Sequence, residues 1–250
     1  AYDASAESNY MSQNFANTYF DTYNSQKIGF IREDIESKFL AHKVNDRERA
    51  MVVTSLIYAM DRISHTCGHY DSFIRDGKYE GELILRMPDN GYELNVNNHV
   101  YCADSNMIAS DESVDVAYLD PPYNSRQYCD AYHLLENVAR WEKPQVFGIA
   151  KKMDRTQMKS NYCKSVEAAK ALRDLVLKLN SRYILLSYNN NGKKLQCRSN
   201  AKMTDEEIIE ILSLRGDVKV FTMGYRGFDA GKSEFNKDNQ ERIFLCSVNK

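Results

Sequence analysis

The sequence lacks the long apolar runs of a membrane protein and the paired cysteines of a disulfide-rich one. No apolar stretch approaches the roughly 18 residues that a membrane span needs, and the opening AYDASAESNY does not have the charged-then-apolar order of a signal peptide. The six cysteines are scattered singly, with no CxxC pair, as in reduced cytosolic proteins. The 250 residues and the 43% hydrophobic content suffice for a large globular core, and we expect a cytoplasmic protein.

Net charge is also small. The 33 basic and 35 acidic residues leave −2, which taken alone argues against a polyanionic partner. The distribution is uneven, however, because residues 151–202 contain 13 Lys and Arg against three acids, an excess of +10 that leaves −12 for the remainder. One surface of the protein could therefore bind a nucleic acid.

Helical periodicity dominates the first 80 residues. Apolar side chains recur at the i, i+3, i+4 spacing from about residue 33 to 63, and shorter helical patterns cover residues 5–19 and 70–75. The segment ELILRMPDNGYELNV then changes to a period of two around Pro-Asp-Asn-Gly, which predicts a β-hairpin over residues 82–96. We therefore expect a mostly helical N-terminal part that ends in a hairpin.

Strand patterns alternate with helical ones after the hairpin. Helices are expected to begin near Gln127, Cys163 and Thr204, and strands are predicted for HVYCAD, VDVAYLD, SRYILLSY, DVKVFTMGY and ERIFLCSV. Strand, helix, strand at this spacing predicts an α/β sheet of mainly parallel order. The last two strands have no helix between them, so they should form an antiparallel pair at one edge.

Asp120 ends the strand VDVAYL and is followed by Pro121, Pro122 and Tyr123, although the chain has only four prolines. Ligands of open α/β sheets bind at the carboxyl ends of the strands. The prolines fix φ and remove two backbone donors, so the loop is rigid and its backbone mainly accepts hydrogen bonds. An NH2 group fits it, with one hydrogen to the Asp120 carboxylate and the other to the Pro121 carbonyl, while Tyr123 offers a face to a planar ring. The alternative is a structural Pro-Pro turn with a capping Asp and a core Tyr.

This DPPY segment resembles the signature of N6-adenine DNA methyltransferases, whereas the related cytosine-N4 and glutamine methyltransferases usually have Ser or Asn in place of the Asp. LDPPYNSRQY followed by AYHLLENVARW is similar to the Dam-like class, and most similar to its FokI-type modification methylases. The similarity runs from about residue 19 to the C-terminus and includes YFDTYNSQKIGFIREDIE, SLIYAMDRISHTCGHYDSF and ILLSYNNNG.

The resemblance implies a site-specific adenine methyltransferase with a Rossmann-like, S-adenosylmethionine-dependent sheet and a mostly helical target-recognition insertion. Asp120, Pro121, Pro122 and Tyr123 would hold an adenine that has been flipped out of double-stranded DNA. The methyl group of S-adenosylmethionine would be attacked in line by N6, without a metal or a covalent intermediate. A restriction-modification system with a separate cognate endonuclease is implied as well.

Contacts to the methyl donor are also implied by the resemblance. Asp104 matches the acidic residue that in this class hydrogen-bonds the adenine of the donor, although an Asp that caps the following turn would look the same, and Asp104 can do both. Asp120 and Tyr128 are expected beside the donor. Asp3 matches, by a single letter, the acid that binds the donor ribose.

DNA contacts are expected from the loop and from the basic run after it, because cations beside a base-flipping loop neutralise phosphates. A solvated face is the ordinary alternative for such a run. Tyr188 and Asn189 match the next pocket segment of the family, although an Asn-rich turn alone would look similar. The residues assigned to DNA are Asn124, Arg126, Lys151, Lys152, Arg155, Lys159, Lys193 and Lys194.

The HTCGH segment places His65, Cys67 and His69 at alternate positions, as metal ligands could be. A structural zinc site normally closes with four ligands, and the sequence has no second cluster. We therefore expect no metal, and we interpret Gly68 as the residue that allows a tight turn.

The glycine-rich FxGxG turn that the family uses for the methionine part of the donor has no counterpart, since the glycines never occur as GxG. We expect the missing strand upstream of Ala1. Supply of that half by another polypeptide, or loss of donor binding, are the alternatives. The expected domains are residues 1–18 as a catalytic remnant or a leader, 19–98 as the target-recognition region, and 99–250 as the catalytic domain.

Two other functions remain open. One is a non-catalytic DNA-binding or specificity subunit that needs a second chain for donor binding. The other is an RNA adenine methyltransferase.

Overall fold

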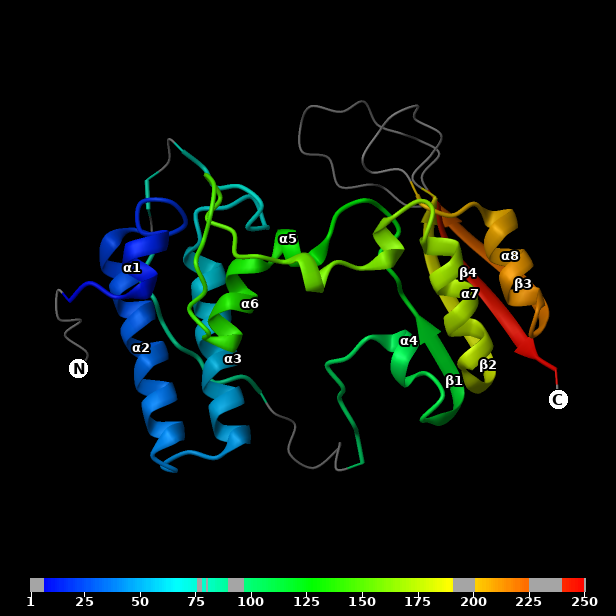
Figure 1. Cartoon of the computed structure of the whole chain (residues 1–250), viewed down its shortest axis with the longest axis horizontal. Coiled ribbons are helices and arrows are strands. Elements are labelled where there is room, and N and C mark those ends of the chain that lie inside the picture. Colours follow the sequence, from blue (N-terminus) through cyan, green and yellow to red (C-terminus); the bar gives the residue numbers. More distant parts are fainter. Residues whose placement is uncertain are drawn as a thin grey trace. The chain divides into compact units, whose positions relative to one another are not determined.

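The chain forms two compact units (Figure 1). The helical unit comprises Ala1–Asn98 and Tyr128–Met158, and the sheet unit comprises His99–Gln127 and Lys159–Lys250. The computed structural model describes residues 7–75, 78–79, 81–89, 97–190, 201–224 and 240–249, without the side chains of residues 190 and 240. The chain thus enters the helical unit a second time between two segments of the sheet unit.

Two long helices, α2 (Thr22–Leu40) and α3 (Asp46–Ile63), form the frame of the helical unit. Three short helices belong to the same unit: α1 (Tyr10–Phe15), α5 (Tyr128–Ala131) and α6 (His133–Arg140). Their apolar faces share one core, which includes Met11, Phe15, Tyr19, Ile28, Leu56, Met60, Leu134 and Val138. The N-caps of α1, α2 and α3 are Asn9, Asp21 and Asn45, whose side chains accept from the first-turn amides, as such residue types favour.

Several helical predictions for this unit were wrong in extent. The helix expected over residues 33–63 is interrupted, because His42 takes a left-handed φ of 54° and Asn45 starts a new helix with a capping box to Glu48. Residues 70–75 form no helix, since the Tyr70 N–H donates instead to the Ala131 carbonyl at 2.7 Å. In the region expected to be helical from residue 5 to 19, helix α1 spans only residues 10–15.

The predicted hairpin is not formed by residues 82–89, which contain no strand. This segment packs against α3 instead, where the Ser55 hydroxyl donates to the Arg86 carbonyl at 2.8 Å. Residues 90–96, the second half of the predicted hairpin, lie outside the described part of the chain.

The sheet unit contains a four-stranded mixed sheet in the order β1-β2-β4-β3. The strands are β1 (Ser113–Leu119), β2 (Asn180–Asn190), β3 (Gly216–Gly224) and β4 (Gln240–Val248). The antiparallel pairing of β3 with β4 at one edge is confirmed. Mainly parallel order is wrong for the described strands, because only β1 and β2 pair in parallel and β4 is antiparallel to both of its neighbours.

The expected strand at residues 99–104 is also not formed. These residues are irregular and lead into α4 (Ser105–Ile108), a single helical turn. Of the expected helices, the one predicted to begin near Thr204 is confirmed as α8 (Asp205–Ser213), and Thr204 is its N-cap. The helix expected near Cys163 begins later, as α7 (Ala168–Lys178), after a short 3-10 turn at Asn161–Cys163.

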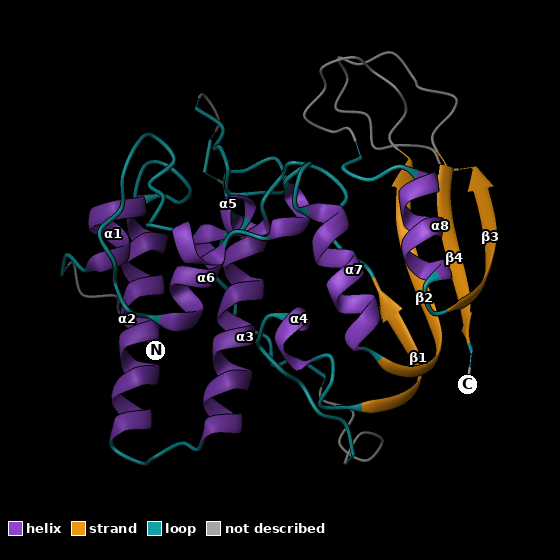
Figure 2. Cartoon of the chain, turned by 45° about the vertical axis from the view of Figure 1, so that its right-hand side comes forward, coloured by secondary structure: helices purple, strands orange, loops and turns teal. Residues whose placement is uncertain are grey.

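Helices α7 and α8 lie along one face of the sheet (Figure 2). The side chains that meet them form a second core, which includes Leu172, Val176, Ile184, Leu186, Tyr188, Ile208, Leu212 and Phe244. The pleat turns the alternate side chains to the other face. We call this the bare face, because its large apolar side chains are 40% to 70% exposed: Val114, Val116, Tyr118, Tyr183, Phe221, Met223 and Ile243. Across the described residues, no helix is both long enough and apolar enough to span a bilayer.

Candidate active site

Asp120 follows the last residue of β1, so it lies at the carboxyl end of this strand, as predicted. The register pairs Leu119 with Leu186, which places the neighbouring strand end, with Tyr188, beside the loop. Asp120 is exposed, whereas Pro121, Pro122 and Tyr123 are half-buried. The loop thus presents its carboxylate to solvent on a partly buried support.

The Tyr123 carbonyl is held by two donors. The Lys202 N–H donates to it at 2.9 Å and the Tyr188 hydroxyl at 3.3 Å. The rings of Tyr123 and Tyr188 also meet edge to face, with centroids 6.3 Å apart and planes at 79°. The backbone of Tyr123 is therefore fixed from the β2 side.

The remainder of the loop is closed by side chains. The Asn124 side-chain oxygen accepts from the Arg126 N–H at 2.8 Å, and the Cys163 thiol donates to the Arg126 carbonyl at 3.3 Å. The Gln127 amide makes two hydrogen bonds with the backbone of Ser160, accepting from its N–H at 2.8 Å and donating to its carbonyl at 3.1 Å. The sequence does not predict these two hydrogen bonds, because a single Gln carries no signal for a partner 33 residues away.

Asp104 is the N-cap of α4, and its carboxylate accepts from the Asn106 N–H at 2.9 Å. The Asn106 side chain ties this turn to α7 by donating to the Ala171 carbonyl at 2.8 Å, and it accepts from the Tyr162 hydroxyl at 3.0 Å. Burial, and secondarily the negative charge of Asp104, raise the pKa of Tyr162. The capping role considered for Asp104 is present, and its side chain remains exposed.

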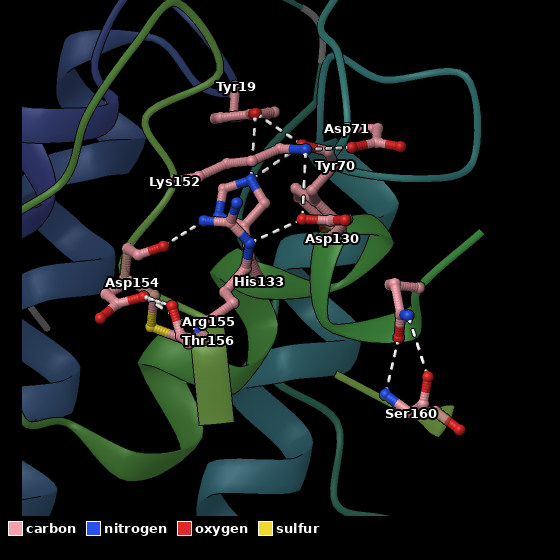
Figure 3. Close-up of polar contacts among 12 residues, drawn as sticks. Tyr19, Tyr70, Asp71, Asp130, His133, Lys152, Asp154, Arg155, Thr156 and Ser160 are labelled. Carbon is pink, nitrogen blue, oxygen red and sulfur yellow. Dashed lines mark hydrogen bonds and ion pairs between the residues drawn. The ribbon is translucent and has the colours of Figure 1, made fainter. Parts of the chain in front are cut away.

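Among the described residues, four predicted site residues belong to the helical unit. Tyr128, the first residue of α5, is 63% exposed, and Lys151 is half-buried with a left-handed φ of 49°. Lys152 forms an ion pair with Asp71, and Arg155 donates to Asp130 at 2.6 Å (Figure 3).

The cations of these ion pairs are mostly buried, since the side chains of Lys152 and Arg155 are 21% and 19% exposed, whereas the Asp71 side chain is 41% exposed. Lys152 also lies 3.8 Å from Asp130, so two carboxylates and two cations neutralise one another. The structure therefore joins Lys152 to Arg155 through the shared carboxylate of Asp130, a link that charge counting along the sequence cannot show. Lys159 belongs to the sheet unit and is exposed.

A buried polar cluster lies behind these ion pairs. The His133 ring contacts the Tyr70 carbonyl at 2.8 Å through Nε2, and the Tyr19 hydroxyl lies within 2.8 Å of the carbonyls of Tyr70 and Ala150. Burial lowers the pKa of His133 to about 4, so the imidazole is neutral at pH 7. The sequence carries no local signal for this cluster, because it joins residues far apart in the chain.

The HTCGH segment forms a turn in which Gly68 has a φ of 88°, in agreement with the tight turn expected there. The His65 ring packs on Tyr79 with centroids 4.8 Å apart, and Cys67 is exposed. No group of three or more His, Cys, Asp or Glu side chains gathers as a metal site among the described residues. The predicted residues Asp3, Lys193 and Lys194 lie outside those residues.

Comparison with known families decides the identity. The family of D12 class N6 adenine-specific DNA methyltransferases matches residues 3–196. The chain belongs to this family. The match to the D12 class covers β1, the DPPY loop, the described helices of the helical unit and β2, whereas β3 and β4 lie beyond it.

Individual relatives support the assignment. The modification methylase StsI of Streptococcus sanguinis is 34% identical over 98% of this chain and 35% of its own length. The type II methyltransferase M.FokI of Planomicrobium okeanokoites is 32% identical over 90% of the chain and 34% of its own length. M.NlaIII of Neisseria lactamica is 30% identical over 86% of the chain and 62% of its own length. The chain thus spans about a third of the length of the first two relatives, and no solved structure matches it.

Proposed function

We propose that the chain transfers a methyl group from S-adenosylmethionine to N6 of a flipped-out adenine in double-stranded DNA, as part of a type II restriction-modification system. The observation that carries this proposal is the DPPY loop at the carboxyl end of β1, with an exposed carboxylate on a half-buried support. The family membership and the modification methylases among the relatives support it. A cognate restriction endonuclease would act as a separate protein, and we expect the enzyme in the cytoplasm.

In this proposal the loop acts on the amino group. The Asp120 carboxylate and the Pro121 carbonyl accept the two N6 hydrogens, which increases electron density on a nitrogen whose lone pair is otherwise delocalised into the ring. The Tyr123 ring stacks on the base and keeps N6 in line for attack. The new N–C bond would form as the bond between the methyl carbon and the donor sulfur breaks, S-adenosylhomocysteine would leave, and Asp120 would accept the proton that N6 releases.

The methyl donor, when bound, supplies an electrophilic methyl group. Asp104 and Asp120 are exposed acceptors suited to its polar groups, and Tyr128 offers an exposed ring. The sequence offers no GxG turn for the methionine end, so the residues present fit only part of the donor. We infer that this chain provides the amine-binding part of the site.

For the DNA surface we propose phosphate contacts by Arg126, Lys151 and Lys159, together with a loop contact by Asn124. Arg126 and Lys159 are exposed. Lys193 and Lys194 remain proposed contacts that lie outside the described residues. We expect Lys152 and Arg155 to contribute less to phosphate binding, because both already form ion pairs with carboxylates.

Radiolabelled methyl transfer to genomic DNA from a methylation-deficient strain, with the full upstream sequence restored to the protein, tests the proposal, because genomic DNA offers every recognition site. We expect N6-methyladenine with the wild-type protein and none with Asp120→Ala, while DNA binding by the variant persists. Wild-type protein that binds the donor yet forms no N6-methyladenine would refute the proposed activity.

One second function is favoured by the absence of GxG, namely a specificity subunit whose donor site is completed by another polypeptide. Calorimetric titration of the chain with S-adenosylmethionine separates the two functions, since clear binding disfavours the subunit. Competition between duplex DNA and RNA as substrates tests the remaining alternative, an RNA adenine methyltransferase.

A further inference from the structure

The hydroxyl of Tyr188 has three hydrogen-bond partners from two other segments. It donates to the Tyr123 carbonyl at 3.3 Å and accepts from the N–H groups of Lys202 and Met203, each at 3.1 Å. A tyrosine hydroxyl has one hydrogen and two lone pairs, so this oxygen is fully satisfied. Burial raises the pKa of Tyr188, which keeps the hydrogen in place.

The side chain is built into the fold rather than exposed to a ligand. Tyr188 is 1% exposed and belongs to the core under α7 and α8. It pairs with Arg242 across β2 and β4, and Arg242 in turn forms an ion pair with Asp205 at the start of α8. A direct contact of Tyr188 with adenine or donor is therefore not required to explain its place beside the loop.

Three segments meet at this hydroxyl. Tyr123 belongs to the DPPY loop, Tyr188 to β2, and Lys202 and Met203 precede the cap of α8 at Thr204. The Lys202 N–H also donates to the Tyr123 carbonyl at 2.9 Å, which closes a small ring of hydrogen bonds. The edge-to-face contact of the two tyrosine rings adds a second restraint on Tyr123.

We propose that Tyr188 is a positioning residue that sets the orientation of Tyr123, and with it the stacking surface beside Asp120. This inference rests on the proposed adenine chemistry of the loop, and it assigns to Tyr188 a role without direct ligand contact. The orientation matters because a small misplacement of reacting groups lowers the rate of transfer more than the affinity for substrate.

The test is Tyr188→Phe, which removes one oxygen, and the matched control is Tyr183→Phe, on the same strand but on the bare face with a 40% exposed side chain. We expect kcat for methyl transfer to fall by about 10-fold or more in Tyr188→Phe, with the KM for DNA within about 2-fold of wild type. Tyr183→Phe should retain the wild-type kcat. An unchanged kcat in Tyr188→Phe would overturn the proposal.

A second control separates positioning from general destabilisation. Ile208→Val removes one methylene group from the same core, where Ile208 is fully buried. It should lower the unfolding temperature without lowering kcat at a temperature well below the transition. If Ile208→Val lowers kcat as much as Tyr188→Phe does, the role of Tyr188 is only structural and the proposal is wrong.

Amide hydrogen exchange provides a readout that does not depend on methyl transfer. The Met203 amide should be protected in the wild type and in Tyr183→Phe, and should exchange at least about 10-fold faster in Tyr188→Phe. Equal exchange in all three proteins would refute the hydrogen-bond geometry. A wild-type protein that shows this protection but transfers no methyl group would instead refute the proposed function.

Discussion

The two units differ in how far their charged and apolar side chains are paired or covered. In the helical unit, Lys152 and Arg155 pair with Asp71 and Asp130, and His133 is buried as a neutral ring among backbone carbonyls. In the sheet unit, one face is covered by helices, whereas the bare face leaves seven large apolar side chains at least 40% exposed. The cations Arg126 and Lys159 of this unit are also exposed.

This difference shows that a basic run in the sequence is not one uniform surface. Residues 151–155 and Lys159 are neighbours in the chain, yet two of these cations are neutralised within the helical unit. Covered and bare faces of the sheet differ in the same way, because adjacent residues of one strand have opposite surroundings. The following experiments test this contrast, from the largest expected effect to the smallest.

The contrast between the two sheet faces predicts the largest effect. Ile184→Ala removes a fully buried side chain from the covered face and should lower the free energy of unfolding by about 2–5 kcal/mol. Ile243→Ala makes the same change on the bare face, where the side chain is 40% exposed, and should cost about 1 kcal/mol or less. Urea unfolding of both variants measures this. Equal losses would contradict the assignment of the faces.

The buried His133 predicts a pH dependence of the helical unit. Its pKa is lowered from 6.5 to about 4 in the folded state, so the unfolded chain binds the additional proton between these values. The free energy of unfolding should therefore fall by up to about 3 kcal/mol as the pH is lowered from about 6.5 to 4. Above pH 6.5 His133 is neutral in both states, so it should cause no further change in stability. Thermal unfolding against pH measures it.

His133→Gln should reduce this pH dependence, whereas His99→Gln, at an exposed position, should leave it as in wild type. Identical pH curves for wild type and His133→Gln would show that the imidazole is not buried as a neutral group.

The partly buried ion pair of the helical unit predicts a smaller effect. Asp130→Asn weakens the contact with Arg155, and we expect a loss of about 1–2 kcal/mol in unfolding free energy. The control is Asp115→Asn, whose partner Arg182 lies 3.2 Å away in a pair that is more than 70% exposed on both sides. The control should be unchanged within error, since exposed ion pairs contribute little. A larger loss for the control would reverse the comparison.

The smallest effect concerns DNA affinity. Each phosphate contact adds about 0.9 to the slope of log K against log salt. Lys159→Gln should therefore lower this slope by about 0.9, and Lys152→Gln, at a cation paired with Asp71, should leave it unchanged. Fluorescence anisotropy with a labelled duplex at several salt concentrations measures both slopes. A lower slope for Lys152→Gln would show that Lys152 contacts a phosphate despite its ion pair with Asp71.

Local patterns in the sequence predicted much of the candidate site. The strand before Asp120 was found from its apolar run, and the start of α8 near Thr204 from its helical pattern, because both depend on neighbours in the chain. The same reasoning failed for residues 70–75 and 99–104. In the first case the backbone bonds to α5, and in the second the chain turns into α4. Short patterns do not show which distant partner a segment will meet.

The sequence by itself determined the strand before Asp120, the proline pair that follows it, the antiparallel pair of strands at the C-terminal edge and the family. Only the tertiary structure decided that Tyr188 supports Tyr123 from within the core, that Lys152 and Arg155 share their charge with acids, and that one face of the sheet is bare. The physical reason is the sequence separation over which each interaction acts. Periodicity, capping and proline stiffness act over a few residues, whereas hydrogen bonds, ion pairs and burial join segments that only the fold brings together.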